Sequence, residues 1–525
     1  MADSAILNSS GVRTAELIAA ISMATDLAMG FPLEHGLQSS VIAARLCDRL
    51  DVDRETASQA YFLSLLFYVG CNAPAEVGWD VFGDDDSLIT YASPFRFGSR
   101  AEMARGMMRA VAPPTAPAHI RVWRVSRHLP ELAIGFAGVV DATCEVARML
   151  TDELGLGPPV SNLVAFESVR WDGKGFPGGV AGDEIPLAVR IAHVARDAAF
   201  QLILGDVEFV SDVIGRRAAQ AFDPVVARTF TQDAAGILDL ESELPLWDLA
   251  LGCEPKPWSM LDGGAIDRAL AAMGHFTDMS IPEFVGHSSG VATTCLAAAQ
   301  VLSFDSADSL TVHRAALVHD LGRAAVPIRI WSKRRSLTLD DWERIRLHAY
   351  HTERILTQSP FLSDLVPVAG FHHERVDGTG YHRGVGVSSM ERPARVLAAA
   401  DAYHAMTEPR PHRPALSRGA AAEVLAGEAK AGRLDPEAVA AVLEGGGHSA
   451  ASVPWPAGLT EREIQVVRHL ARGLQTKQIA RALEISPKTV DFHIQSAYRK
   501  MGVSTRAGAT LFAMQHGLTT WENSR

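Results

Sequence analysis

The chain has 525 residues, of which 47% are hydrophobic and 21% are charged, and its formal net charge is −12. This length predicts about three domains, and the negative charge argues against nucleic-acid binding by the whole surface. The absence of a long apolar run or a secretion signal, together with five widely spaced cysteines, predicts a reduced cytoplasmic protein that does not associate with membranes.

Two stretches without clear periodicity divide the chain into three segments. Residues 243–264 mix Pro, Gly and Trp, and residues 445–458 are rich in Gly, Ser and Pro, so both are predicted to be linkers. The predicted domains span residues 12–240, 264–444 and 459–520. Runs of alanine and leucine with few β-branched alternations predict an all-α fold.

The first two domains are predicted to be copies of one another. Two pairs of anchor residues recur with the same spacings, 35 and 24 residues. These anchors are His35–Gly70 and Asp172–Arg196 in the first copy, and His287–Gly322 and Asp377–Asp401 in the second. Between its two pairs of anchors the first copy is longer by 47 residues.

The two copies differ in their imidazole and carboxylate groups. The second copy carries Glu283, His287, His319, Asp320, His348, His372, His373 and Asp401. At matching positions the first copy keeps only His35 among these groups, and it has Phe67 and Tyr68 in place of the His–Asp pair. The first copy is therefore predicted to keep the fold without a metal site.

Several of these groups stand in apolar helical sequence. Glu283 and His287 are four residues apart, which predicts that they share one helical face. His319 and Asp320 interrupt an otherwise apolar helix, and Asp401 interrupts another. A single buried His or Asp is more often a satisfied core residue, but several unpaired buried carboxylates would be costly. Divalent iron or manganese, which favours imidazole and carboxylate ligands, would compensate that cost.

The motifs "ALVHDLG" and "FHHERVDGTGY" resemble the HD-GYP branch of the HD metal-dependent phosphohydrolases, over about Glu283 to Arg413. The resemblance implies hydrolysis of cyclic di-GMP or a related cyclic dinucleotide or phosphodiester by two or three iron or manganese ions. It implies that the eight His, Asp and Glu residues named above are the metal ligands. It also assigns catalysis to Asp320 and Arg323, and substrate binding to Tyr381, Arg410 and Arg413, whose guanidinium groups suit phosphates.

Three positions depart from the HD-GYP pattern. Arg323 replaces the lysine after the His–Asp pair, His382 replaces the proline of the Gly-Tyr-Pro motif, and His404 replaces an acid. The ligand set is complete, so these departures concern the substrate and its turnover. Three alternatives follow: an enzyme, a nucleotide-sensing regulator with little turnover, and a purely structural role for both copies.

The C-terminal segment differs in charge from the rest of the chain. Between Leu459 and Leu518 nine Lys and Arg stand against four Asp and Glu, so nucleic-acid contact is predicted here alone. Thr460 and Glu463 form a capping box that predicts the start of a helix. Ser486 and Pro487 predict the start of an amphipathic helix with a basic outer face.

This segment resembles the LuxR-type four-helix DNA-binding domain over about residues 459–520. The resemblance implies that double-stranded DNA is a partner and that the helix from Ser486 to Lys500 enters the major groove. Lys488, Thr489 and Gln495 are the predicted groove contacts, and Arg499 and Lys500 are the predicted phosphate contacts. The resemblance also favours a homodimer, although no coiled-coil heptad stands out in the sequence.

Overall fold

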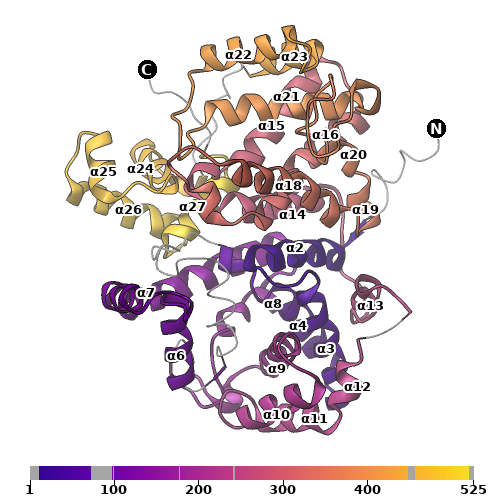
Figure 1. The fold of residues 1–525 in the computed structure, drawn as a ribbon, viewed down its shortest axis with the longest axis vertical. Helices are drawn as coiled ribbons and strands as arrows, with labels where there is room; N and C mark the ends of the chain where they lie inside the picture. The colour runs from indigo at the N-terminus through magenta and orange to yellow at the C-terminus, as the bar shows by residue number, and fades with distance from the viewer. Residues whose placement is uncertain are drawn as a thin grey trace. The chain divides into compact units, whose positions relative to one another are not determined.

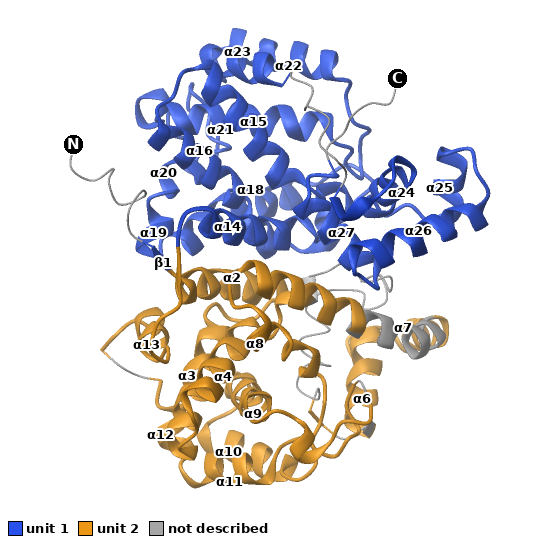
Figure 2. Cartoon of the chain, turned by 180° about the vertical axis from the view of Figure 1, so that it is seen from behind, with its two compact units in different colours: residues 1–12, 262–525 blue, residues 13–261 orange. Residues whose placement is uncertain are grey.

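A computed structural model describes residues 11–72, 97–98, 100–176, 178–240, 243–446 and 456–519, with the backbone alone for 71–72, 100 and 128–140. The chain divides into two compact units, residues 13–261 (unit 2) and residues 1–12 with 262–525 (unit 1) (Figure 2). No helix among the described residues is long and apolar enough to cross a membrane.

The predicted all-α class is confirmed, because helices make up almost all of the regular structure (Figure 1). The exception among the described residues is a sheet of two short strands, β1 (Val12–Arg13) and β2 (Met260–Leu261). The helices of unit 2 are α2 (Thr14–Met29), α3 (His35–Leu50), α4 (Arg54–Leu66), η1 (Val69–Asn72), α6 (Arg100–Val111), α7 (Ala118–Glu153), α8 (Pro158–Ser161), η4 (Val164–Phe166), η5 (Gly182–Glu184), α9 (Leu187–Leu202), α10 (Val207–Arg217), α11 (Pro224–Gln232), α12 (Ala234–Leu238) and α13 (Leu246–Gly252).

Unit 1 contains the second copy and the four C-terminal helices. The second copy is built from α14 (Gly263–Asp278), η6 (Pro282–Phe284), α15 (His287–Val301), α16 (Ser306–Val318), η7 (Leu321–Ala325), α17 (Ile328–Trp331), α18 (Leu339–Leu356), α19 (Pro360–Ser363), α20 (Val366–Ala369), η8 (Val387–Ser389), α21 (Arg392–Thr407), α22 (Arg418–Lys430) and α23 (Pro436–Gly445). The C-terminal helices, after η9 (Pro456–Gly458), are α24 (Glu461–Ala471), α25 (Thr476–Ala482), α26 (Pro487–Met501) and α27 (Arg506–Gln515).

The two units repeat one local arrangement at the start of α3 and α15. In each unit a buried aspartate of the preceding helix accepts a hydrogen bond from the second N–H of this helix. Asp26 accepts from Gly36 at 3.2 Å, and Asp278 accepts from Ser288 at 2.7 Å. The residue before each helix has a positive φ, 73° at Glu34 and 84° at Gly286. This shared detail supports the predicted duplication.

The segment 243–264, predicted to be a linker, contains regular structure. It holds α13 and β2, and Trp247 of α13 is buried. The Tyr61 hydroxyl of α4 donates to the Ala250 carbonyl at 3.0 Å, which fixes α13 against the helices of its own unit. The sequence obscured this helix because its seven residues are too few to show a period. Residues 447–455 of the second predicted linker lie outside the described residues.

Candidate metal centre and helix-turn-helix

Seven of the eight predicted ligands gather within the second copy. His287 begins α15, His319 and Asp320 follow the end of α16, His348 lies in α18, His372 and His373 follow α20, and Asp401 lies in α21. Thr352 holds α18 against the His–Asp turn, since its hydroxyl accepts from Gly322 N–H at 2.9 Å and donates to the His319 carbonyl at 3.0 Å. Five separate helical segments, with the turns that follow two of them, therefore supply one site.

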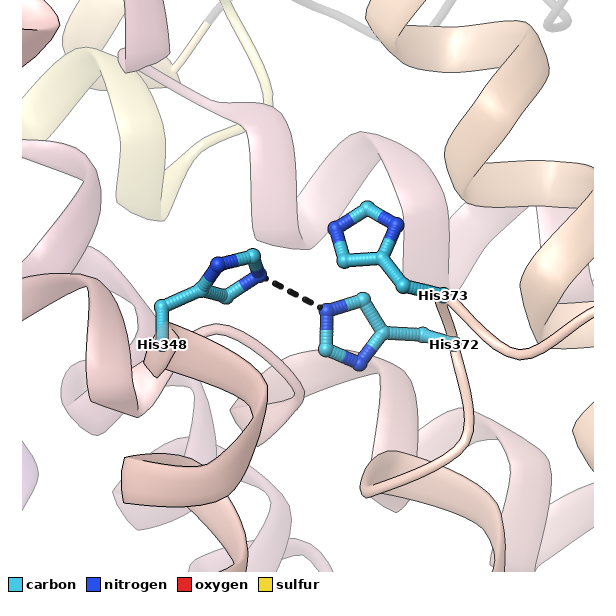
Figure 3. Close-up of side chains that lie close together, drawn as sticks. All are labelled: His348, His372 and His373. Carbon is cyan, nitrogen blue, oxygen red and sulfur yellow. Dashed lines mark hydrogen bonds between the residues drawn. The ribbon is translucent and has the colours of Figure 1, made fainter. Parts of the chain in front are cut away.

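The first group of ligands is His348, His372 and His373, whose rings point toward one another (Figure 3). Nδ1–H of His348 donates to the Ile345 carbonyl at 2.5 Å, and Nδ1–H of His372 donates to the Ala369 carbonyl at 2.7 Å. In each neutral ring Nε2 is then an acceptor, and the two Nε2 atoms lie 3.1 Å apart. Two facing lone pairs at this distance favour a cation beside them.

The second group is His287, His319 and Asp401, all buried. Nε2 of His287 lies 3.2 Å from Asp401 Oδ1, and Nδ1–H of His319 donates to the Ala316 carbonyl at 2.7 Å. Nε2 of both histidines is buried without a hydrogen-bond partner among the described residues. Buried polar atoms are normally paired, so these two suit a metal ion.

Asp320 stands between the two groups. Its Oδ1 lies 3.3 Å from His348 Nε2 and 3.5 Å from His372 Nε2. Its Oδ2 lies 3.4 Å from His287 Nε2 and 3.0 Å from His319 Nε2. One carboxylate oxygen thus faces each group, so Asp320 would offer one oxygen to an ion held by either group. The chemistry of this donor set fits two divalent transition metals.

The electrostatics favour the metal-binding protonation state at Asp320 and His372 but not at His287. Burial lowers the pKa of His287, but the charge of Glu408 and the contacts with Asp320 and Asp401 outweigh burial and raise it well above its usual range. Burial raises the pKa of the Asp320 carboxyl, but the charges of Arg323 and His319 outweigh burial and hold it well below its usual range. Burial lowers the pKa of His372 to about 4, so that ring is neutral near pH 7. A carboxylate and neutral imidazoles can bind metal without first losing protons.

The predicted catalytic and substrate residues lie around this site with different partners. The Arg323 guanidinium lies 2.5 Å from Asp320 Oδ2 and stacks 4.3 Å above the Phe284 ring. The Tyr381 ring lies 4.6 Å from the His373 ring, so it borders the first group. His382, where the family has proline, places Nε2 3.1 Å from Glu353 Oε2.

The two arginines predicted to hold phosphate make internal contacts. Arg410 donates to the Glu283 carbonyl at 2.7 Å and to Glu408 Oε2 at 2.9 Å. Arg413 donates to the Ala405 carbonyl at 2.5 Å, near the end of α21. Both side chains would have to exchange these partners to hold a substrate phosphate.

Two expectations about local structure are wrong. Glu283 and His287 do not share a helix, because Glu283 belongs to η6 and α15 begins only at His287, after the positive φ of Gly286. Among the described residues, the groups close enough to share an ion do not include Glu283. His319 and Asp320 lie beyond the end of α16 at Val318, in the turn to η7.

One charged residue of the site was missed by sequence reasoning. Glu408, the residue that ends α21, lies with Oε2 2.9 Å from His287 Nδ1 and Oε1 2.7 Å from His404 Nδ1. Burial raises the pKa of the Glu408 carboxyl, but His287, His404 and Arg410 outweigh burial and hold it well below its usual range. Its spacing from His404, one helical turn, is the signal that could have found it.

The first copy replaces the metal ligands with an aromatic cage around an arginine. The buried Arg196 guanidinium, which occupies the position of Asp401, lies 4.3 Å from the rings of both Phe67 and Tyr68. Burial, with a contribution from Arg196, lowers the pKa of His35 to about 3. A fixed cation where the second copy has a carboxylate opposes metal binding, which agrees with the predicted loss of the site.

The four C-terminal helices carry the predicted capping signals. The Thr460 hydroxyl accepts from Glu463 N–H at 3.3 Å, and the Ser486 hydroxyl accepts from Thr489 N–H at 3.1 Å, so α24 and α26 begin where expected. The predicted DNA contacts Lys488, Thr489, Gln495, Arg499 and Lys500 are all exposed. Lys500 also donates to Glu463 Oε2 at 2.6 Å, and Ser496 donates to Glu463 Oε1 at 2.7 Å.

The Glu463→Gln variant is expected to loosen α26. Burial raises the pKa of the Glu463 carboxyl, but Lys500, Thr460 and Ser496 outweigh burial and lower it to about 2. Because this value lies below the ordinary 4.5, the stabilisation is present above pH about 4.5 and is lost as the pH falls toward about 2. We expect a loss on the order of 2 kcal/mol, or roughly 30-fold faster amide hydrogen exchange in α26 at pH 7.

The matched control for this exchange measurement is Glu461→Gln. Glu461 is exposed in the first turn of the same helix, where an acid contributes less than about 1 kcal/mol. Equal exchange rates in the two variants would show that Glu463 does not hold α26.

Comparison with known proteins identifies two parts of the chain. The family described as "HD domain" matches residues 274–438, and the family described as "Bacterial regulatory proteins, luxR family" matches residues 457–513. These matches cover most of the second copy and most of the four C-terminal helices.

Relatives of known activity match the chain over different lengths. The 3'3'-cGAMP-specific phosphodiesterase 3 of Vibrio cholerae serotype O1 is 27% identical over 436 residues, which cover 81% of this chain and 93% of that protein. The cyclic di-GMP phosphodiesterase response regulator RpfG of Xanthomonas campestris pv. campestris is 33% identical over 150 residues, which cover 28% of this chain and 39% of that protein.

A solved structure shares the fold over both units. The crystal structure of the cyclic GMP-AMP specific phosphodiesterase V-cGAP3 of V. cholerae has a TM-score of 0.58 and 23% sequence identity. The match covers 84% of this chain and 99% of that one. The chain therefore has a fold that is already known from a solved structure.

Proposed function

Because this chain carries an HD-GYP-like HD domain followed by a LuxR-family helix-turn-helix domain, we propose that it is a DNA-binding regulator whose second copy hydrolyses a cyclic dinucleotide. The observation that carries this proposal is Asp320, whose two oxygens each face one group of buried histidines. When bound there, two divalent ions would make hydroxide available near neutral pH and neutralise phosphate oxygens.

The residues of the chain have distinct roles in this proposal. The histidines of both groups, with Asp320 and Asp401, hold the ions. The lowered pKa values of His372, Asp320 and Asp401 mean that these three need no proton loss on metal binding. Arg323 fixes the Asp320 carboxylate through its contact with Oδ2. Tyr381, on the rim of the first group, positions the substrate, and Arg410 and Arg413 bind its phosphates after exchanging their internal partners.

The substrate class follows from the relatives and from the site together. A relative that matches across both units acts on 3'3'-cGAMP, and a relative that matches a shorter part acts on cyclic di-GMP. Both substrates contain the same two phosphodiester bonds and differ in one base. We propose a cyclic dinucleotide as the substrate, and the assay must therefore include both compounds.

The hydrolysis experiment uses the full chain loaded separately with manganese and with iron. Each preparation is incubated with cyclic di-GMP and with 3'3'-cGAMP, and the linear dinucleotide is separated by chromatography. We expect a linear product from at least one of the two compounds. No product from either compound, in preparations shown to contain two ions per chain, would reject the enzymatic proposal.

The proposed DNA contact predicts two different effects of substitution on α26. Arg499→Ala should weaken binding to all duplexes about equally. It should also reduce the slope of log binding constant against log salt concentration by about one, because one fewer counterion is released. Gln495→Ala should relax sequence preference while leaving the salt dependence unchanged. Binding to a duplex selected from a random library, measured across salt concentrations, checks both. Arg216→Ala, an exposed substitution in unit 2, is the control and should change neither quantity.

A second candidate function is a nucleotide-sensing regulator with little turnover. The internal contacts of Arg410 and Arg413 favour it, because they occupy groups that a substrate would use. His382, which stands where the HD-GYP pattern has proline, also pairs with Glu353. In this case a cyclic dinucleotide should change DNA affinity without being consumed. Measuring DNA affinity and linear product in the same sample separates the two functions.

A further inference from the structure

Three of the proposed histidine ligands are oriented by the main chain of their own segment. In each, Nδ1–H donates to the carbonyl of the residue three positions earlier, at 2.5–2.7 Å. The pairs are His319 with Ala316, His348 with Ile345, and His372 with Ala369. This bond fixes the proton on Nδ1 and leaves the Nε2 lone pair directed into the site.

Among the described residues, His287 has no such carbonyl acceptor for its Nδ1–H. It is the first residue of α15, and the positive φ of Gly286 turns the preceding chain away from the helix direction. The carboxylate of Glu408 takes the place of the missing carbonyl, with Oε2 2.9 Å from Nδ1 of His287. We infer that Glu408 is a positioning residue that fixes the tautomer and orientation of His287 for metal binding. This inference rests on the proposed function.

The Glu408 carboxylate is itself held in place by neighbours on both oxygens. Oε2 also accepts from Arg410 at 2.9 Å, and Oε1 lies 2.7 Å from His404 Nδ1. Glu408 ends the helix α21 that carries Asp401, a ligand of the same proposed ion as His287. Both proposed ligands therefore depend on the position of α21. Asp401 belongs to this helix, and His287 is hydrogen-bonded to it through Glu408.

The first copy provides an internal comparison. By the spacing that aligns Arg196 with Asp401, the counterpart of Glu408 is Ile203, which ends α9 as Glu408 ends α21. Neither ring nitrogen of His35, the counterpart of His287, has a hydrogen-bond partner among the described residues. The positioning carboxylate therefore occurs in the copy that carries the other ligands and not in the copy that lacks them.

Glu408 could instead be a ligand of a third ion, because His287, His404 and Glu408 lie close enough to share one. The hydrogen bond argues against this role, since Nδ1 of His287 uses its proton to donate to Glu408 and its other nitrogen faces Asp401. The number of ions per chain distinguishes a positioning residue from a ligand.

The experiment measures manganese affinity and stoichiometry in the full-length protein by competition with a chromophoric chelator. The variants are Glu408→Ala, which removes the acceptor, and Glu408→Gln, which keeps an acceptor oxygen without the charge. Glu423→Gln, exposed on α22, is the control. Electron paramagnetic resonance reports whether the two manganese ions remain coupled, and thermal melting of each metal-free variant reports whether the fold persists.

We expect wild type and Glu423→Gln each to bind two manganese ions, with the same affinities in both proteins. For Glu408→Ala we expect one of the two ions to bind about 10–100-fold more weakly, with loss of the coupled signal and an intact fold. Glu408→Gln should lie within a few-fold of wild type, because its amide oxygen still accepts from His287. If Glu408→Ala binds both ions as wild type does, or if wild type binds three ions and Glu408→Ala two, the inference is overturned. A wild type without bound metal would instead reject the proposed function.

Discussion

Asp320→Ala is expected to remove both metal ions and to lower the rate of cyclic-dinucleotide hydrolysis by more than about 100-fold. Losing a residue that only hydrogen-bonds to a metal ligand already costs about 10–100-fold, and losing a ligand itself should cost more. The carboxylate faces both groups of histidines, so in the proposed metal centre its removal would take a ligand from two ions at once. Metal analysis of the purified variant, with its rate of product formation, checks the prediction.

The control for this prediction is Asp340→Ala. Asp340 is exposed in the first turn of α18, the helix that carries His348, and it should keep two ions and the wild-type rate. Melting curves of the metal-free proteins show whether Asp320→Ala remains folded. A folded Asp320→Ala protein that keeps two ions would contradict a bridging carboxylate.

Gly322→Ala is expected to destabilise the second copy strongly. A Cβ at this position would come closer than 3.0 Å to the main chain of α18 at His348 and Thr352, where only a backbone shift can relieve the overlap. Overpacking costs about 1–3 kcal/mol, and a backbone contact places this change at the upper end. The melting temperature of the unit that contains α18 should fall by roughly 6–12 °C, and metal affinity should fall with it, because His348 moves.

Gly427→Ala is the control, and it should change stability in the opposite direction to Gly322→Ala. Gly427 lies within α22, and a Cβ there meets nothing within 4 Å. Alanine should stabilise this helix by up to about 1 kcal/mol, so the two substitutions should shift the melting temperature in opposite directions. Equal shifts would show that the close approach at Gly322 does not decide the position of α18.

The helical class could be predicted, and most residues of the candidate site could be singled out, because each left a local signal. Capping residues marked the starts of α24 and α26, and the His–Asp pair stood out against apolar neighbours. The second copy could be compared with a first copy that had lost the same groups, which separated shared architecture from chemistry. The aromatic replacement of the His–Asp pair in the first copy was visible in the same way.

The parts that could not be predicted depend on where helices end. A spacing of four residues predicts a shared face only within one helix, and the positive φ of Gly286 separates Glu283 from His287. Glu408 contacts His287 across 121 positions of sequence, a contact that only the tertiary fold brings together. The family pattern leads one to expect an acid at position 404, where this chain has His404, and the contact of His404 with Glu408 lies one helical turn along the chain.

The most direct test of the proposed metal centre is an anomalous difference map from crystals of the manganese-loaded protein. We predict two peaks, one on each side of the Asp320 carboxylate, each also in contact with histidines of one group, and no peak beside Arg196 in the first copy. An absence of peaks at Asp320, or manganese bound beside His35, would contradict the account.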